Sequence, residues 1–111
     1  MSFTVFEAGG DSLKAHHHLK NLKYIESHGL NLNVIFSDLS HGVMPSITSC
    51  EKILFHALWA DIDSREDRQK FVKNFFEQNG AFKASDRILT FVLEALRMPK
   101  QEESEDVEKK S

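Results

Sequence analysis

The sequence predicts a mainly α-helical fold, namely a small four-helix domain with an irregular or short β-like segment at residues 30–36. Four stretches place apolar residues at helical spacing, and each is bounded by capping residues or by Gly and Pro. Only two short runs, at residues 2–6 and 30–36, have the residue types or the alternation of strands. A length of 111 residues favours one domain, in which about two thirds of the unfolded surface can be buried. A small α+β domain is the alternative.

The first predicted helix covers residues 12–28. Asp11 or Ser12 is its candidate N-cap, and Gly29 follows its last residue, where a left-handed backbone conformation commonly ends a helix. The apolar residues between them follow a period of 3.6: Ala15, Leu19, Leu22 and Ile25.

The two β-like runs flank this helix. SFTVF at residues 2–6 is rich in β-favouring types, and LNLNVIF at residues 30–36 alternates until Ile35 and Phe36 interrupt the pattern. A two-stranded pairing of these runs is the α+β alternative. Because an isolated pair of short strands is only marginally stable, we expect residues 30–47 to form an irregular or short helical connection.

The second and third helices are marked by their N-caps. Thr48 and Glu51 form a capping box that starts a helix at about residues 48–61, with Trp59 near its end. Asp63-Ser64 opens the third, which Asn79-Gly80 closes. The apolar stripes of the two helices are Ile53, Leu54, Ala57, Leu58 and Trp59, and Phe71, Val72, Phe75 and Phe76.

The fourth predicted helix starts at Ser85-Asp86, and Pro99 ends it. It is apolar nearly all round, and its apolar residues are Ile88, Leu89, Phe91, Val92, Leu93, Ala95, Leu96 and Met98. Residues 100–111 contain a single apolar residue, Val107, and bury too little surface to offset the entropy of ordering. We therefore expect a single helical domain at residues 1–99 and a disordered acidic tail at residues 100–111.

Composition and charge exclude several classes of function. The net charge is −3, and no block of the chain has the concentrated positive charge that binds nucleic acid. No run reaches the roughly 18 apolar residues of a membrane span. Cys50 is the one cysteine, so no internal disulfide can form, and a reducing compartment is expected. The sequence thus predicts an intracellular protein, cytoplasmic or nuclear, with neither nucleic acid nor membrane as partner.

The string Gly9-Gly10-Asp11-Ser12-Leu13 resembles the modification motif of phosphopantetheine carrier domains of the peptide-synthetase type. The resemblance implies that Ser12, at the start of a helix, is the attachment site of the prosthetic group. Carrier domains have a long helix before this motif, whereas eleven residues precede Ser12 here. Read from the residues alone, two glycines and an Asp-Ser pair form a turn and an N-cap.

The Gly-Asp-Ser-Leu part of this string is also similar to the motif of the GDSL hydrolases. Those enzymes need an Asp-x-x-His pair near their C-terminus, which has no counterpart here, since no histidine follows His56. We therefore expect no catalytic activity. The triplet His16-His17-His18 lies within the first predicted helix, where adjacent side chains point about 100° apart. The three side chains therefore cannot bind one metal ion together, and Cys50 has no CxxC partner. We expect neither a metal nor another cofactor.

The phenylalanines of the third and fourth helices, with Phe82 in the turn between them, predict two antiparallel helices with a shared aromatic core. One helix that is apolar on all sides is nevertheless hard to bury in so small a domain, which indicates a partner surface. The expected function is that of an adaptor or regulatory protein–protein interaction domain, which binds a partner helix or a second copy of itself. The expected partner-binding residues are Trp59, Phe76, Phe91 and Met98, with Arg68 and Lys73 in a polar rim.

Overall fold

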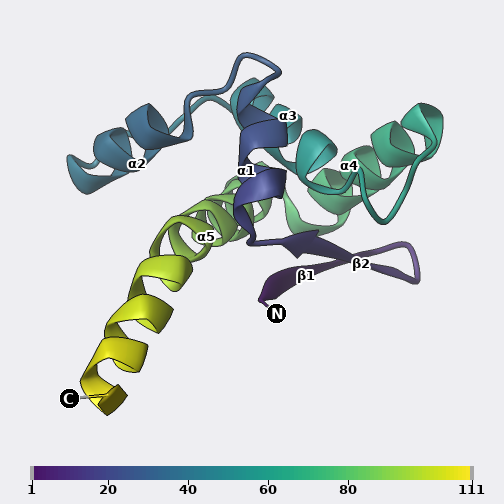
Figure 1. Ribbon diagram of the computed structural model, residues 1–111. Coiled ribbons are helices and arrows are strands. Elements are labelled where there is room, and N and C mark those ends of the chain that lie inside the picture. The colour runs from purple at the N-terminus through teal and green to yellow at the C-terminus, as the bar shows by residue number, and fades with distance from the viewer. Residues whose placement is uncertain (1, 111) are drawn as a thin grey trace.

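A computed structural model describes the backbone of residues 2–110 and the side chains of residues 2–97. Within that range the fold is mainly α-helical with one small antiparallel sheet, as the sequence predicts (Figure 1). The elements are β1 (Phe3–Ala8), β2 (Asp11–His16), α1 (Leu19–Glu26), α2 (Leu32–Ser40), α3 (Ile47–Ala57), α4 (Arg65–Asn79) and α5 (Ala81–Lys110). The strand that the α+β alternative places at residues 2–6 is present, but its partner is β2 and not the run at residues 30–36.

The β1–β2 hairpin replaces the first half of the helix predicted at residues 12–28. Its turn consists of Gly9 and Gly10, with φ of 58° and 86°, and Ala8 pairs with Asp11 across it. Two successive residues with positive φ are what a two-residue hairpin loop needs, and glycine adopts them without steric cost. Ser12 therefore lies in a strand, and its predicted position at a helix N-terminus is wrong.

Helix α1 begins only after the histidine triplet. The Nδ1 atom of His18 accepts a hydrogen bond from the backbone N–H of Asn21 at 3.3 Å and caps the helix. Since the preceding residues are extended, the rings of His16 and His18 lie on one side and stack at 5.3 Å, while His17 is buried on the other. The predicted helical placement of the triplet is therefore wrong.

Residues 32–40 form helix α2, so the β-like interpretation of residues 30–36 is wrong, while the short helical connection is confirmed. The side chain of Asn31 accepts a hydrogen bond from the N–H of Val34 at 3.0 Å and caps the helix. Leu32 and Ile35 are buried on one helical face. Val34, which the alternating pattern would bury with Leu32, is 51% exposed.

Helices α3 and α4 follow the predicted pattern with small shifts. Ser46 caps α3, so the capping box at Thr48 and Glu51 is not its N-terminus, and α3 ends at Ala57, before Trp59. Helix α4 has the predicted cap, because the Ser64 hydroxyl accepts from the N–H of Asp67 at 3.3 Å. Gly80, with φ of 84°, is the single residue between α4 and α5.

Helix α5 begins earlier and ends later than predicted. It starts directly after Gly80, and it continues through Pro99 to Lys110, because the Glu, Gln and Lys residues beyond Pro99 are good helix formers. Its C-terminal part extends away from the rest of the chain (Figure 1). The predicted domain boundary at residue 99 and the disorder of residues 100–111 are not tested by these bounds and remain predictions.

The hydrophobic core surrounds the first half of α5, which packs against α2, α3 and α4. The rings of Phe6 and Phe75 meet edge-on at 5.3 Å, and those of Phe6 and Phe91 meet at 6.2 Å, which joins the hairpin to α4 and α5. The apolar circumference of α5 is therefore explained by its central position. Phe82, predicted to share this aromatic core, is 76% exposed.

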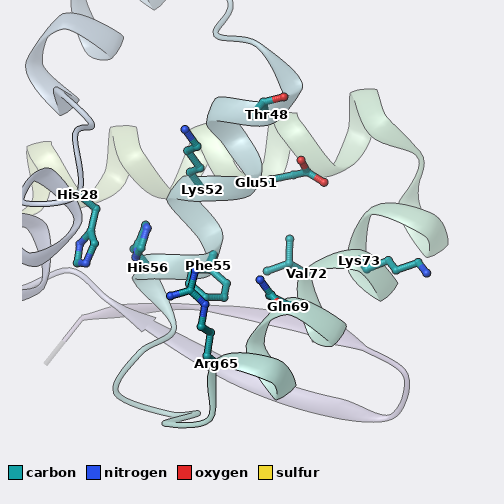
Figure 2. Close-up of a pocket in the computed structure, with 10 residues that line it drawn as sticks. All are labelled: His28, Thr48, Glu51, Lys52, Phe55, His56, Arg65, Gln69, Val72 and Lys73. Atoms are coloured by element: carbon teal, nitrogen blue, oxygen red, sulfur yellow. The ribbon is translucent and has the colours of Figure 1, made fainter.

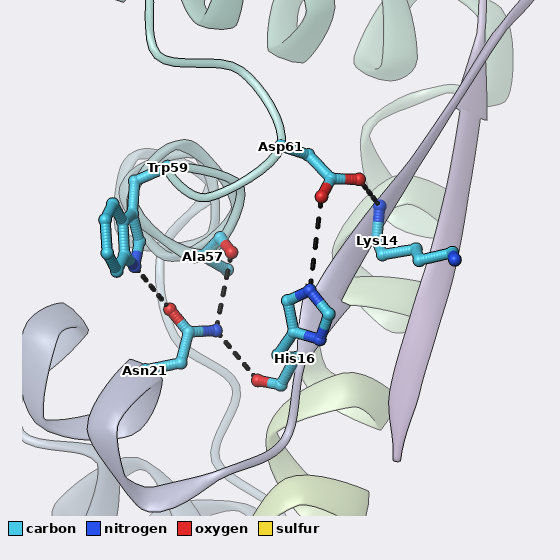
Figure 3. A network of polar contacts seen from close by, with 6 residues as sticks. All are labelled: Lys14, His16, Asn21, Ala57, Trp59 and Asp61. Carbon is cyan, nitrogen blue, oxygen red and sulfur yellow. Dashed lines mark hydrogen bonds and ion pairs between the residues drawn. The ribbon is translucent and has the colours of Figure 1, made fainter. Parts of the chain in front are cut away.

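A buried asparagine fixes the position of the C-terminal end of α3 (Figure 3). The side-chain amide of Asn21 donates to the carbonyls of His16 at 2.7 Å and Ala57 at 3.4 Å, and its oxygen accepts from the Trp59 indole at 2.8 Å. Asp61 accepts from the backbone N–H of Lys14 at 2.7 Å. These bonds join β2, α1 and the end of α3, and so hold α3 beside α1.

Candidate binding cleft between α3 and α4

A cleft of about 580 Å³ lies between α3 and α4 and reaches the turn after α1 (Figure 2). Phe55 and Val72 provide its apolar lining. Thr48, Lys52 and Phe55 recur at spacings of four and three on α3, and Arg65, Gln69 and Val72 do so on α4, so that each helix turns one face toward the cleft.

Two arginines of α4 position the ring of Phe55. The guanidinium of Arg68 lies 4.5 Å from the centroid of the Phe55 ring, and that of Arg65 lies 5.9 Å away, so both make cation–π contacts. Arg68 also donates from Nη1 to the Phe55 carbonyl at 3.3 Å. It is 9% exposed, and its Nε atom has no hydrogen-bond partner. Arg68 thus supports Phe55 from within the protein, and its predicted place in an exposed rim is wrong.

The cleft carries positive charge although the whole chain is acidic. Among the described side chains, Lys52, Arg65 and Lys73 line it against one carboxylate, that of Glu51. This excess of two positive charges contrasts with the net charge of −3 of the chain. A concave, partly apolar surface with several cations favours a ligand that has both apolar and anionic groups.

Two histidines form one end of the cleft. The rings of His28, in the turn after α1, and His56, on α3, stack at 3.9 Å with an interplanar angle of 17°. Burial, the largest cause, and the neighbouring His28, Arg68, Arg65 and Lys52 together lower the pKa of His56 from 6.5 to about 4. His56 is therefore neutral at pH 7.

The other buried titratable groups lie outside the cleft. Burial lowers the pKa of His17, whose Nε2 atom lies 2.7 Å from the hydroxyl of Thr4. Burial raises the pKa of the Cys50 thiol, which is enclosed in the core. Among the residues with described side chains, no group of three or more His, Cys, Asp and Glu is arranged to hold a metal ion.

Among the predicted partner-binding residues whose side chains are described, not all reach the surface. Phe91 is fully buried, so its predicted role at a partner surface is wrong. Trp59 and Phe76 are half-buried, and Trp59 is held by Asn21 and by the ring of Tyr24 at 4.7 Å. The side chain of Met98 lies outside the described residues. Lys73 is exposed and lines the cleft.

Ser12, the residue of the carrier-like alternative, lies within strand β2 and does not begin a helix. Its side chain is exposed next to the hairpin turn, and its hydroxyl donates to a Glu7 carboxylate oxygen at 3.3 Å. The resemblance to carrier domains implies a serine that begins a helix. This local structure does not match that requirement, so the carrier function is not proposed.

Apart from Lys73, sequence reasoning did not assign a binding role to the residues that line the cleft, among them His28, Lys52, Phe55 and Val72. A usable signal was the helical spacing of polar and apolar residues along one face of α3 and one face of α4. The sequence pattern pointed to the consecutive histidines at 16–18. The two histidines that stack in the cleft, His28 and His56, are instead 28 positions apart in the chain.

Neither a protein-family model, nor a curated protein, nor a solved structure matches this chain. Within the described part of the chain, every helix is too short or too polar to cross a membrane. The geometry of the cleft is therefore the basis on which a function is proposed.

Proposed function

We propose that this domain is a non-catalytic protein-binding module, and that the α3–α4 cleft receives an acidic segment of its partner. The observation that supports the proposal is the concentration of Lys52, Arg65 and Lys73 around an apolar lining in an otherwise acidic chain. This retains the expected class of function but moves the binding surface from the predicted set of Trp59, Phe76, Phe91 and Met98 to the cleft.

The cleft offers an apolar surface and positive charge, and both contribute to the recognition of an acidic peptide segment. Covering an aromatic or aliphatic side chain of the partner on Phe55 and Val72 contributes about 1.5–3 kcal/mol for each buried side chain. Charge complementarity around this centre sets the orientation and accelerates association.

A site-specific cross-link tests this proposal. In one full-length variant p-benzoylphenylalanine replaces Gln69, which lines the cleft, and in a matched variant it replaces Gln78, an exposed residue on the same helix beside the β1–β2 turn. After irradiation in a lysate of the source cells, we expect a discrete adduct from position 69 alone. Mass spectrometry of the adduct should map the contact to a segment rich in Asp and Glu.

The control position decides how the result is interpreted. Equal adducts from positions 69 and 78 would indicate non-specific contact and contradict the proposal. So would the absence of an adduct from position 69, or an adduct that maps to a segment without acidic residues.

A further inference from the structure

One end of the cleft brings together four basic side chains from three parts of the chain (Figure 2). His28 comes from the turn after α1, Lys52 and His56 are four residues apart on one face of α3, and Arg65 is the first residue of α4. Glu51, the carboxylate that lines the cleft, lies toward the opposite end with Lys73 (Figure 2).

The histidine pair is held in a fixed arrangement. His28 Nδ1 lies 2.9 Å from the carbonyl oxygen of Tyr24, to which it can only donate, so its Nε2 atom carries the lone pair in the neutral ring. The ring of Tyr24 packs 4.7 Å from that of His28. On the other side of the stack, the ring of His56 meets Phe55 edge-on at 5.0 Å. Both imidazoles are thus positioned before any ligand binds.

The basic groups packed around His56 oppose its protonation. These groups are His28 beside it, Lys52 on its own helix, and Arg65 and Arg68 on α4. Together with burial they hold the pKa of His56 at about 4. A negative charge placed among them would offset this repulsion and favour the imidazolium form.

We propose that this end of the cleft is a subsite for a carboxylate of the bound segment, and that its occupation is coupled to uptake of a proton by the His28–His56 pair. The proton comes from solvent and adds to an imidazole nitrogen, and no covalent bond to the ligand forms. The inference rests on the proposed function and adds to it a regulation by pH.

The direction of the pH effect follows from linkage. The bound state holds more protons than the free state, so affinity rises as pH falls. The largest slope for one proton is about tenfold in affinity for each pH unit. Measurements between pH 7.5 and pH 5.5 stay above the range in which a glutamate of the ligand itself becomes protonated, about pH 4.3.

The test uses the full chain and two synthetic probes, acetyl-Glu-Leu-Glu-Leu-Glu-amide and its analogue with Gln at each Glu position. Affinities are measured by calorimetry at pH 7.5 and 5.5 for the wild type, His56→Gln and the control His41→Gln, which changes an exposed histidine outside the cleft. We expect the Glu probe to bind the wild type and His41→Gln at least about threefold more tightly at pH 5.5. His56→Gln should lose most of this pH dependence.

A nuclear magnetic resonance titration keeps the test independent of the variant. In the wild-type chain the imidazole protons of His56 should titrate at a higher pH with the Glu probe bound than without it. Binding of the Glu probe with neither a pH-dependent affinity nor a shifted titration would overturn the proton coupling and leave the proposed function standing. Equal binding of the two probes, or no binding of the Glu probe, would overturn the carboxylate subsite and contradict the proposed acidic partner as well.

Discussion

The substitution Phe91→Ala is expected to lower the free energy of unfolding by about 3–5 kcal/mol. Phe91 is fully buried in the first half of α5, with its ring 6.2 Å from Phe6 and 5.6 Å from His17. Truncation leaves a cavity where the hairpin, α4 and α5 meet, and small domains have only about 5–15 kcal/mol of total stability. Urea denaturation followed by circular dichroism measures the change.

Phe82→Ala is the matched control, since it makes the same truncation on the same helix at a side chain that is 76% exposed. It should change the free energy of unfolding by less than about 0.5 kcal/mol. If both variants lost the same small amount of stability, α5 would not be the central helix of the core. The apolar circumference of α5 would then require a partner, as its sequence first indicated.

The double substitution Lys52→Glu/Arg65→Glu is expected to weaken binding of the segment captured at position 69 by about hundredfold or more. Each reversal removes an attraction and adds a repulsion next to the ligand, and about 1.4 kcal/mol for each corresponds to tenfold in affinity. Both side chains line the cleft from opposite helices. Fluorescence anisotropy of the labelled synthetic segment measures the dissociation constant.

A variant with the same net charge separates the local effect from the global one. Lys20→Glu/Lys83→Glu also replaces two cations by carboxylates, but at exposed positions of α1 and α5 outside the cleft. We expect it to change the dissociation constant by less than about threefold at physiological salt, where charges beyond about 8 Å are largely screened. Equal losses in the two double variants would mean that the overall charge of the chain, and not the cleft, controls binding.

The parts of the fold that could be predicted are those with local causes. The Ser64 cap and Gly80 bound α4 because each acts within one turn of the helix. The hairpin could not be distinguished from a helix in the same way. Ala15 satisfies both the period of a strand and that of a helix, and the backbone conformation of Gly9 and Gly10 decides between them.

The candidate site depends on tertiary contacts that no local pattern shows. His28 and His56 meet because Asn21 joins β2, α1 and the end of α3. Phe91 and Phe82 look alike as apolar residues of one helix, yet one is enclosed and the other exposed, because the layers around α5 cover only one of them. Helix faces could therefore be predicted, but not which faces would meet.

The most direct measurement on the cleft is the set of intermolecular nuclear Overhauser effects between the full chain and the acidic segment captured at position 69. The account predicts contacts from the ring protons of Phe55 and the methyl groups of Val72, which line the cleft. It predicts none from the methyl groups of Val34 or Val43, which are 51% and 53% exposed in and after α2. Contacts to these valines without contacts to Phe55 and Val72 would contradict it, because they would place the partner on α2.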